Sequence, residues 1–344
     1  QWTSDGLFQD GSHSTFRAGR LTMDFGKRRL MARNRFRNTK NAFTGVDGIW
    51  QAKNGETVRA MFTMPVNREP TVATQLLQND ADFDKETTAK ILWGLFASTP
   101  NLPWESKAEM YLFGYYEDDS PTLSTNNRKL YTPGFRLYRP IKTGRFDYEW
   151  ESILQFGTSR ATTTATDTRD LDHFAHFNHA EVGYTFSMPW TPRLILAYDH
   201  ASGDENPNDG KNGSFFSLYG ASVFDYGPSS INGAFSRSNI TGPGAKFYIQ
   251  PHKNFKASMH YRAFWLASDT AKWAGNSGLR DTSGNSGSFL GQQVFLRGAW
   301  QTTANLRLEG GVNHRINGDF QATVPNGPRQ GNSTYTYLSV SLSF

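Results

Sequence analysis

The chain of 344 residues contains no cysteine. A disulfide framework, a cysteine-ligated zinc or iron–sulfur site and thiol catalysis are therefore excluded. The chain also lacks an uncharged apolar run of about 18 residues, the length that a membrane-spanning helix needs, which excludes a helical membrane protein. Charged residues make up only 19% of the chain, whereas aromatic residues make up 14%. Because disordered chains are poor in aromatic side chains, this composition indicates a folded protein.

Segments of roughly ten residues that alternate apolar with polar side chains recur along the chain, and stretches with a helical period are rare. At residues 146–156, Phe146, Trp150 and Leu154 fall on one face, and Asp147 and Glu149 fall on the other. The same alternation recurs at 179–186, 260–265 and 337–344. A period of two predicts β-strands with one apolar face and one wet face, and therefore an all-β protein.

The predicted connections between these strands alternate between tight turns and long polar loops. Tight turns are predicted at residues 53–56, 142–145, 189–192, 251–254 and 302–305. Long polar stretches lie between them, at 67–86, 158–173, 202–241, 268–286 and 318–333. Short periplasmic turns and long extracellular loops are typical of outer-membrane barrels, so we predict a transmembrane antiparallel β-barrel with about 14 strands in this chain. It forms a single domain over residues 1–344 and lies in the bacterial outer membrane.

A secreted all-β protein, such as a sandwich or a lectin-like roll, is an alternative because its strands alternate in the same way. Such a protein would act as a sugar-binding or adhesion module that uses aromatic faces. This alternative does not explain why short and long connections alternate. The two hypotheses differ in whether the protein needs detergent to stay in solution.

Basic residues are concentrated near the N-terminal end of the chain, which has a formal net charge of +5. Nine lysine and arginine residues lie between Arg17 and Lys40, opposed only by Asp24. We expect this segment to begin as a strand that carries Met23 and Phe25 on one face. Basic runs are typical of nucleic-acid, anionic-lipid or polyanion sites. Without a groove-reading helix or a base-stacking platform, we expect no nucleic-acid partner.

Two interpretations of the basic segment stay open. One is binding of lipopolysaccharide phosphate on the outer rim. The other is that a basic loop at residues 27–40 folds into the lumen and forms a constriction with positive potential.

Further charged residues fall on the strand faces opposite to the apolar ones. The basic members of this set are Arg59, Arg136, Arg193, Lys256, Arg262, Arg297, Arg307 and Arg315, and the acidic members are Asp47, Glu109, Asp147, Glu149, Glu151, Glu181, Asp199 and Glu309. A charge that faces lipid near the midplane costs about 2–4 kcal/mol, so we expect these residues to line a charged, hydrated interior. Arginine predominates, and its planar fork matches a carboxylate. A pore lined in this way favours carboxylated solutes over neutral ones.

Few features of the sequence indicate a bound metal ion. His173, His176 and His179 have a helical ligand spacing, but on a strand His176 points away from the other two. Residues 202–213 offer the hard oxygens of Asp204, Asn206, Asn208 and Asp209. The glycine and glutamate positions of an EF-hand are not matched there. We expect no resident metal or cofactor, and calcium in this surface loop stays open.

Few features of the sequence indicate catalysis. Ser258 and His260 lie two residues apart on one strand face and could suggest a hydrolase pair. Neither a carboxylate that would orient the histidine nor an oxyanion hole is placed beside them. We therefore expect that the protein is not an enzyme.

Three groups of motifs stand out in the sequence. The first is FRAGRL at 16–21, FG at 25–26, RRL at 28–30 and NAFTGVDG at 41–48, the second is SFFSLYG at 214–220, and the third is YRAFWLASDT at 261–270 with LGQQ at 290–293. These motifs resemble the opening signature, a loop motif and a late strand and loop of the alginate export porin family. The resemblance extends from about Phe16 to Phe344.

The resemblance implies an eighteen-stranded outer-membrane barrel that passes alginate or a related uronate polymer through a narrow, arginine-rich constriction built partly by inward-folded loops. The selectivity residues that it implies are Arg20, Arg28, Arg29, Arg136, Arg262, Arg297, Arg307 and Arg315. Residues 5–11 look like the tail of a preceding strand, so we expect N-terminal strands to be missing.

The partners expected are the polysaccharide, outer-membrane lipid, lipopolysaccharide and periplasmic secretion proteins, and the channel is expected to act as a monomer. A broader uptake porin for small anions or acidic nutrients is a second hypothesis from the same fold. It shares the barrel but has a wider lumen, and sugar oligomers would not block it.

Overall fold

The structure is a computed structural model in which residues 1–34, 40–121, 123–227, 234–275, 278–328 and 331–343 are described. Its long strands are β2 (His13–Leu21), β3 (Phe43–Gln51), β4 (Thr57–Asn67), β6 (Lys90–Leu102), β7 (Ser106–Glu117), β8 (Lys129–Arg139), β9 (Phe146–Ser159), β10 (Leu171–Thr185), β11 (Arg193–Ala201), β13 (Ile240–His252), β14 (Phe255–Trp265), β15 (Phe289–Gln301), β16 (Leu306–Asn317) and β17 (Ser333–Leu342). The short elements are β1 (Trp2–Asp5), β5 (Lys85–Glu86), β12 (Lys211–Asn212), α1 (Ala73–Leu77), η1 (Pro103–Glu105), α2 (Val223–Tyr226) and α3 (Asp319–Thr323). None of these described helices has the length and apolar character that crossing a membrane requires.

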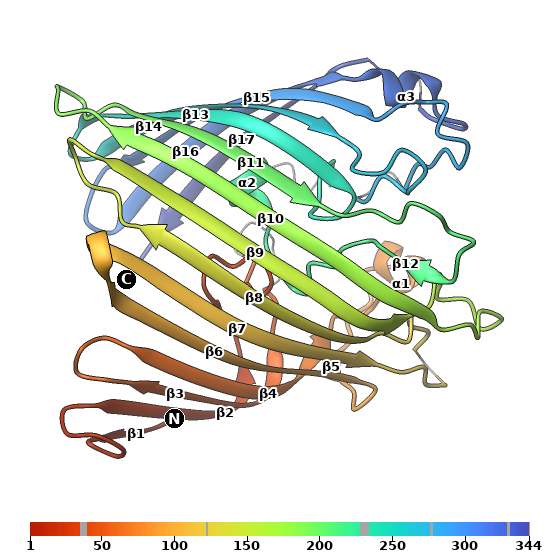
Figure 1. Ribbon diagram of the computed structural model, residues 1–344, viewed down its shortest axis with the longest axis horizontal. Helices are drawn as coiled ribbons and strands as arrows, with labels where there is room; N and C mark the ends of the chain where they lie inside the picture. Colours follow the sequence, from red (N-terminus) through yellow and green to blue (C-terminus); the bar gives the residue numbers. More distant parts are fainter. Residues whose placement is uncertain (35–39, 122, 228–233, 276–277, 329–330, 344) are drawn as a thin grey trace.

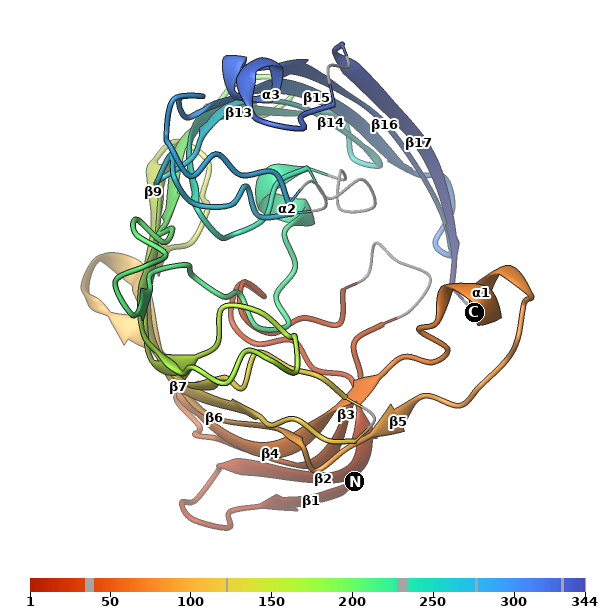
Figure 2. The ribbon, with the colours of Figure 1, turned by 90° about the vertical axis from the view of Figure 1, so that its right-hand side faces the viewer.

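Each long strand pairs in antiparallel register with the next long strand along the chain, which gives a continuous meander. β1 pairs with β2, and no pairing among the described residues joins β17 directly to β1. The strands curve around an interior that contains α2 and part of the segment after β2 (Figure 2). The prediction of an all-β antiparallel barrel wall is confirmed, and its fourteen described long strands agree with the expected number.

Connections at the two ends of the strands differ in length (Figure 1). The tight turns at one end include all five that the sequence predicts. A sixth connection there, η1 between β6 and β7, was not predicted. Long connections at the other end join β2 to β3, β4 to β6, β7 to β8, β9 to β10, β11 to β13, β14 to β15 and β16 to β17. The strand tail predicted over residues 5–11 is wrong beyond Asp5, because Gly6 and Gly11 adopt positive φ and residues 6–12 form the turn to β2.

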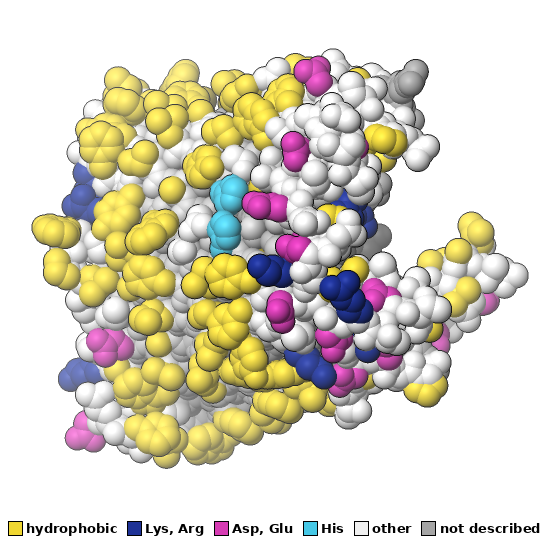
Figure 3. Space-filling view, turned by 45° about the vertical axis from the view of Figure 1, so that its right-hand side comes forward, with side chains coloured by type: hydrophobic (Ala, Val, Ile, Leu, Met, Phe, Trp, Pro, Cys, Tyr) yellow, Lys and Arg dark blue, Asp and Glu magenta, His cyan; other side chains and the backbone are white. Residues whose placement is uncertain are grey.

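Apolar side chains cover the outward face of the sheet, and charged side chains point inward. On β9, Phe146, Trp150 and Leu154 are 62%, 49% and 46% exposed, whereas the intervening Asp147 and Glu149 are buried. Hydrophobic side chains accordingly spread across the outer wall in Figure 3. This distribution confirms the sidedness that the alternation predicts.

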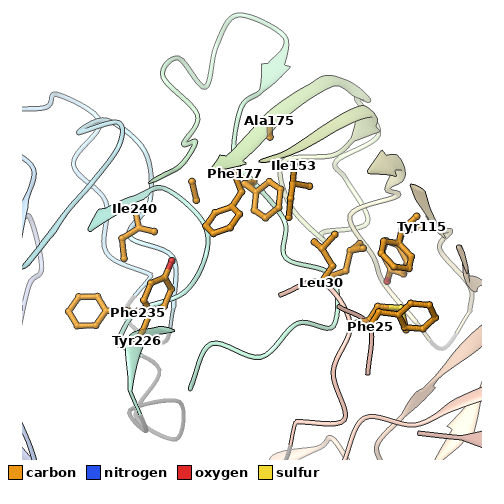
Figure 4. Packing of buried hydrophobic residues seen from close by; sticks show 14 of the residues in the cluster. Phe25, Leu30, Tyr115, Ile153, Ala175, Phe177, Tyr226, Phe235 and Ile240 are labelled. Atoms are coloured by element: carbon orange, nitrogen blue, oxygen red, sulfur yellow. The ribbon is translucent and has the colours of Figure 1, made fainter. Parts of the chain in front are cut away.

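Loops fill the half of the interior that lies toward the long-loop end. Met23, Phe25 and Leu30 from the loop after β2 belong to the same buried apolar cluster as Phe215 and Tyr226 from the loop between β11 and β13. Inward side chains of the wall complete this apolar cluster (Figure 4). The expectation of a hydrated interior is therefore wrong for this half, because alternation describes strands and says nothing of where loops pack.

The segment after β2 also differs from its predicted form. The strand ends at Leu21, and Met23 and Phe25 lie beyond its end. Both side chains are buried in the interior cluster, at 1% and 6% exposure. Their spacing of two therefore reflects packing against the inner wall and not an extension of the strand.

The sidedness of the wall predicts opposite tolerance to charge at neighbouring positions. Leu296 is 49% exposed on the outward face of β15, and the native Arg297 beside it pairs with Glu309 on the inward face. Replacing Leu296 with arginine should lower the free energy of unfolding by about 2–4 kcal/mol, because the charge would face hydrocarbon. Urea unfolding in lipid vesicles measures this loss. Leu296→Phe is the control and should change stability little; a loss below about 1 kcal/mol for Leu296→Arg would contradict the assigned face.

Candidate functional site

A cavity of about 790 Å³ occupies the half of the interior toward the tight turns. Residues of the turns at its mouth include Ile141, Thr143 and Thr191. Its charged lining consists of the basic residues Lys27, Arg28, Arg136, Arg139, Arg193, Lys246 and Lys256 and the acidic residues Asp147, Glu149, Glu181 and Asp225. Basic side chains therefore outnumber acidic ones around this space.

Four of the basic lining residues are paired with carboxylates of the wall. Arg136 donates to Glu109 at 2.8 Å and to Glu149 at 3.0 Å. Lys27 lies 3.3 Å from a Glu149 oxygen, Lys246 lies 2.8 Å from Glu181, and Arg193 pairs with Asp147. These pairs neutralise much of the wall charge inside a region of low dielectric.

The other three basic lining residues, Arg28, Arg139 and Lys256, form no ion pair within the described part of the chain. The Arg28 guanidinium lies 5.1 Å from the centre of the Phe224 ring of α2. Arg139 donates to the backbone carbonyl of Phe146 at 3.4 Å. The cavity therefore combines a neutralised wall with three cations that are available to an anionic solute.

Arg29 lies deeper, between the loops and the wall, with its side chain 1% exposed. Its Nη1 donates to Glu149 Oε1 at 2.7 Å and also to Glu151, while its Nε donates to Asp225 Oδ2 at 3.0 Å. Arg237 Nη2 donates to the same Asp225 oxygen at 2.7 Å. Arg29 thus connects the loop after β2, the wall strand β9 and the loop that carries α2.

The two loop charges in this cluster stabilise one another. Burial disfavours the charged form of Arg29, but Asp225, Glu151 and Glu149 outweigh it and raise the pKa of Arg29 well above its usual value. Burial also opposes ionisation of Asp225, yet Arg29 and Arg237 hold the pKa of that carboxyl well below its usual range. Both groups therefore stay charged at neutral pH.

A second buried cluster lies beside the first. Arg262 of β14 pairs with Asp199 of β11, and His179 Nδ1 lies 2.5 Å from the other Asp199 oxygen. The Arg262 guanidinium is 5.3 Å from the centre of the Tyr226 ring. The segment that carries α2 therefore contacts both charge clusters.

The family model for alginate export matches residues 3–332 of the chain. The chain belongs to the alginate export family. Among solved structures it is similar to the outer membrane protein opdK from Pseudomonas aeruginosa, at 12% identity and a TM-score of 0.58. That similarity covers 97% of this chain and 76% of opdK. No curated protein sequence matches the chain.

The family match confirms the predicted family and the bacterial outer membrane as the location of this protein. The similarity to opdK confirms the predicted barrel fold. Membership of this family supports an outer-membrane channel protein. The similarity to opdK, at its low identity, is evidence for the fold alone.

The structure brings together some of the eight arginines that the family resemblance implies. Arg28 and Arg136 line the cavity, and Arg29 is joined to it through Glu149 and Asp225. Arg262 is buried behind this cavity, against Asp199.

The remaining four arginines lie elsewhere. Arg297 and Arg307 both pair with Glu309, at 2.6 and 2.9 Å. Arg315 donates to Asn317 and Gln321 near the long-loop end of β16. Arg20, near the end of β2, pairs with Glu86 at 2.7 Å in the loop between β4 and β6. These four arginines therefore do not line the cavity that Arg28 and Arg136 line, and the role of the eight in selectivity stays a prediction.

The basic segment of this alginate export protein divides among several places. Lys27, Arg28 and Arg29 point into the interior, Arg17 pairs with Asp47 of β3, and Arg33 lies 3.1 Å from Asp24. Arg35 and Arg37, within the basic loop predicted at 27–40, lie outside the described residues.

Sequence reasoning missed several residues of the site. Lys246 lies on the inward face of β13, and the assignment of alternate residues to that face, which found Arg262, could have found it. Arg139 ends β8, where alternation is no longer informative. Asp225 and Arg237 lie in an aperiodic loop, and no sequence signal marked them.

The metal candidates fall in separate places. His173 and His179 are buried on the inward face of β10, whereas His176 lies against His200 with ring centres 5.2 Å apart. No group of three or more histidine or acidic residues within the described ranges is arranged to hold a metal ion. In the loop at 202–213, Asp204 accepts a hydrogen bond from the Gly213 amide, and calcium there stays an open alternative.

The catalytic candidate also gains no support from its contacts. No hydrogen bond joins Ser258 to His260 in the described part of the chain. The His260 ring instead packs near Tyr248 and Phe295, with ring centres 5.1 and 5.6 Å away. These contacts are those of a residue that lines the wall.

The charge cluster around Arg29 should respond to pH in a defined way. Because the folded-state pKa of Asp225 is depressed, the contribution of its charge to loop attachment is present above the usual aspartate pKa of about 3.9. It should be lost only as the pH falls below that value, through the folded-state pKa. Hydrogen exchange of residues 219–226, corrected for its intrinsic pH dependence, should therefore stay slow from pH 7 to pH 5 and accelerate only in stronger acid. Faster exchange already between pH 7 and pH 5 would contradict the assignment.

Arg29→Met should accelerate exchange in the same residues at pH 7, because it leaves three buried carboxylates without their shared cation. Breaking a buried pair by removing one partner costs about 3–5 kcal/mol. Arg307→Met is the matched control, since Arg307 is 44% exposed and pairs with Glu309 of its own strand, β16. It should leave the exchange of residues 219–226 unchanged.

Proposed function

We propose that this protein is an outer-membrane channel that passes an anionic polysaccharide, alginate or a related uronate polymer, through an arginine-bearing constriction. The observation that carries the proposal is a set of three cations around one cavity, Arg28, Arg139 and Lys256, which have no carboxylate partner among the described residues. They come from the loop after β2 and from the wall strands β8 and β14. A carboxylate in the cavity is therefore attracted from more than one side.

The paired and unpaired charges have different tasks in this mechanism. Paired residues such as Arg136 and Glu149 fix the wall and the loop in place. The unpaired cations lower the cost of removing water from each uronate carboxylate. Because conduction needs binding that also releases, a few exposed cations serve transport better than a site in which every carboxylate is fully enclosed.

The proposal includes the basic loop at residues 27–40 as part of the constriction. Lys27 and Arg28 line the cavity, and Arg29 contacts β9 from the inside. These contacts favour the lumen over lipopolysaccharide for this part of the loop. Phe224 and the tyrosines Tyr138 and Tyr248 add aromatic surface to the same cavity, which suits the faces of sugar rings.

Neutralising the three unpaired cations together, with Arg28→Gln, Arg139→Gln and Lys256→Gln, should abolish most of the anion preference. The reversal potential under a salt gradient in planar bilayers measures this change. Block of small-ion current by oligouronate should weaken at least about tenfold, which corresponds to about 1.4 kcal/mol of lost attraction. The combination of Arg20→Gln and Arg307→Gln removes two cations that do not line the cavity and should leave both properties unchanged.

The outcomes separate the two channel hypotheses. Anion preference with oligouronate block supports the polysaccharide channel. Anion preference without block favours the broader uptake porin. A wild-type channel with neither property would overturn both.

A further inference from the structure

Asp225 is a carboxylate of the protein itself that occupies a site built from arginines. Arg29 donates to both of its oxygens, from Nε to Oδ2 at 3.0 Å and from Nη2 to Oδ1 at 3.3 Å. Arg237 adds a third charged donor to Oδ2 at 2.7 Å. This two-armed arrangement is the one by which arginine recognises a carboxylate of any origin.

The surroundings of this site resemble those of a ligand-binding position. Asp225 lies at the boundary of the 790 Å³ cavity together with Phe224. The guanidinium groups of Arg28, Arg29 and Arg237 all lie within 5.8 Å of the centre of the Phe224 ring. An aromatic face beside three arginines offers both an apolar contact and charge to a carboxylated ring.

The segment that carries Asp225 has limited support from regular structure. α2 has only four residues, and Gly227 with a φ of 82° follows directly after it. The backbone amides of Asp225 and Tyr226 both donate to the Ser222 carbonyl. Asp225 is also the only acidic residue between Asp209 and Ile240, so no other carboxylate of this stretch can take its place.

The two arginines would remain in place without Asp225. Arg29 also donates to Glu149 and Glu151, and Arg237 also donates to the backbone carbonyl of Ala221 at 2.7 Å. An incoming carboxylate that replaced the Asp225 side chain would leave the net charge of the site unchanged. Exchange of one carboxylate for another is therefore compatible with the rest of the cluster.

We propose that Asp225 is a resident stand-in for a solute carboxylate, and that Arg29 and Arg237 form a carboxylate-binding site that a uronate occupies when Asp225 moves away. The inference rests on the proposed function for the identity of the solute. The site itself requires only an accessible carboxylate. It adds to the channel a binding position between the cavity and the packed loops, which the protein keeps filled in the absence of solute.

Asp225→Ala in the full chain, refolded in detergent, tests the site directly. The variant should bind sodium acetate and sodium glucuronate at least about tenfold more tightly than the wild type in calorimetric titrations, because the internal competitor is gone. Acetate should also slow the hydrogen exchange of residues 219–226 in the variant, and sodium chloride at equal ionic strength should not. Equal carboxylate affinity in variant and wild type would overturn the proposal.

Two controls accompany this variant. Asp281→Ala removes another buried loop aspartate, whose partners are the hydroxyls and backbone amides of Ser283 and Ser286, and it should gain no affinity for acetate. Adding Arg237→Gln to Asp225→Ala should abolish the gained affinity. A gain that persists without Arg237 would place the binding elsewhere and would also overturn the proposal.

If Asp225→Ala does not fold, the wild type provides the test. High sodium glucuronate should accelerate hydrogen exchange at residues 219–226 by displacing Asp225, and glucose should have no effect; no acceleration by glucuronate would overturn the proposal. The result is distinguishable from a failure of the proposed function. If the channel showed no anion preference, the acetate titration would still test the site formed by Arg29 and Arg237. If the channel were anion-selective but Asp225→Ala gained no affinity for carboxylates, only the stand-in role of Asp225 would be overturned.

Discussion

The structure depends on the cost of placing a charge against hydrocarbon. That cost fixes which face of each strand is turned outward, and in so doing it collects the charged side chains of the wall inside one enclosed space. Inside, charges without partners would be expensive, so most of them pair across neighbouring strands, as Arg136 does with Glu109 and Glu149. The same constraint that makes the outside uniform makes the inside a network of ion pairs.

The loops join this network through arginine. Arg29 and Arg237 bring two loops that are distant in sequence to one carboxylate, Asp225, and Arg29 fastens them to Glu149 and Glu151 of β9. Apolar side chains such as Phe25 and Tyr226 bury surface but do little to fix the orientation of the loops, because hydrophobic contact is not directional. The hydrogen bonds of the guanidinium groups fix that orientation. Loop position inside this barrel is therefore set by a small number of charges and filled in by apolar side chains.

The sequence predicts the wall far better than its contents. Alternation places Leu296 outward and Arg297 inward because each strand repeats every two residues and one side must be apolar. It also finds Arg136 and Arg262 as inward residues. It fails at Met23 and Phe25, which show a strand-like spacing but lie beyond the end of β2, and at Asp225 and Arg237, which belong to a loop without any period. The constriction was expected from composition and resemblance, but the partners of each arginine depend on long-range contacts that no local pattern encodes.

The interior is filled unevenly, with packed loops toward one end and open, basic space toward the other. An applied voltage of one sign draws anions into the open basic end first, and the opposite sign draws them against the packed loops. Current at equal and opposite voltages should therefore differ in size, so the barrel would act as an ionic rectifier whose preferred direction is set by the end at which its mouth is wide.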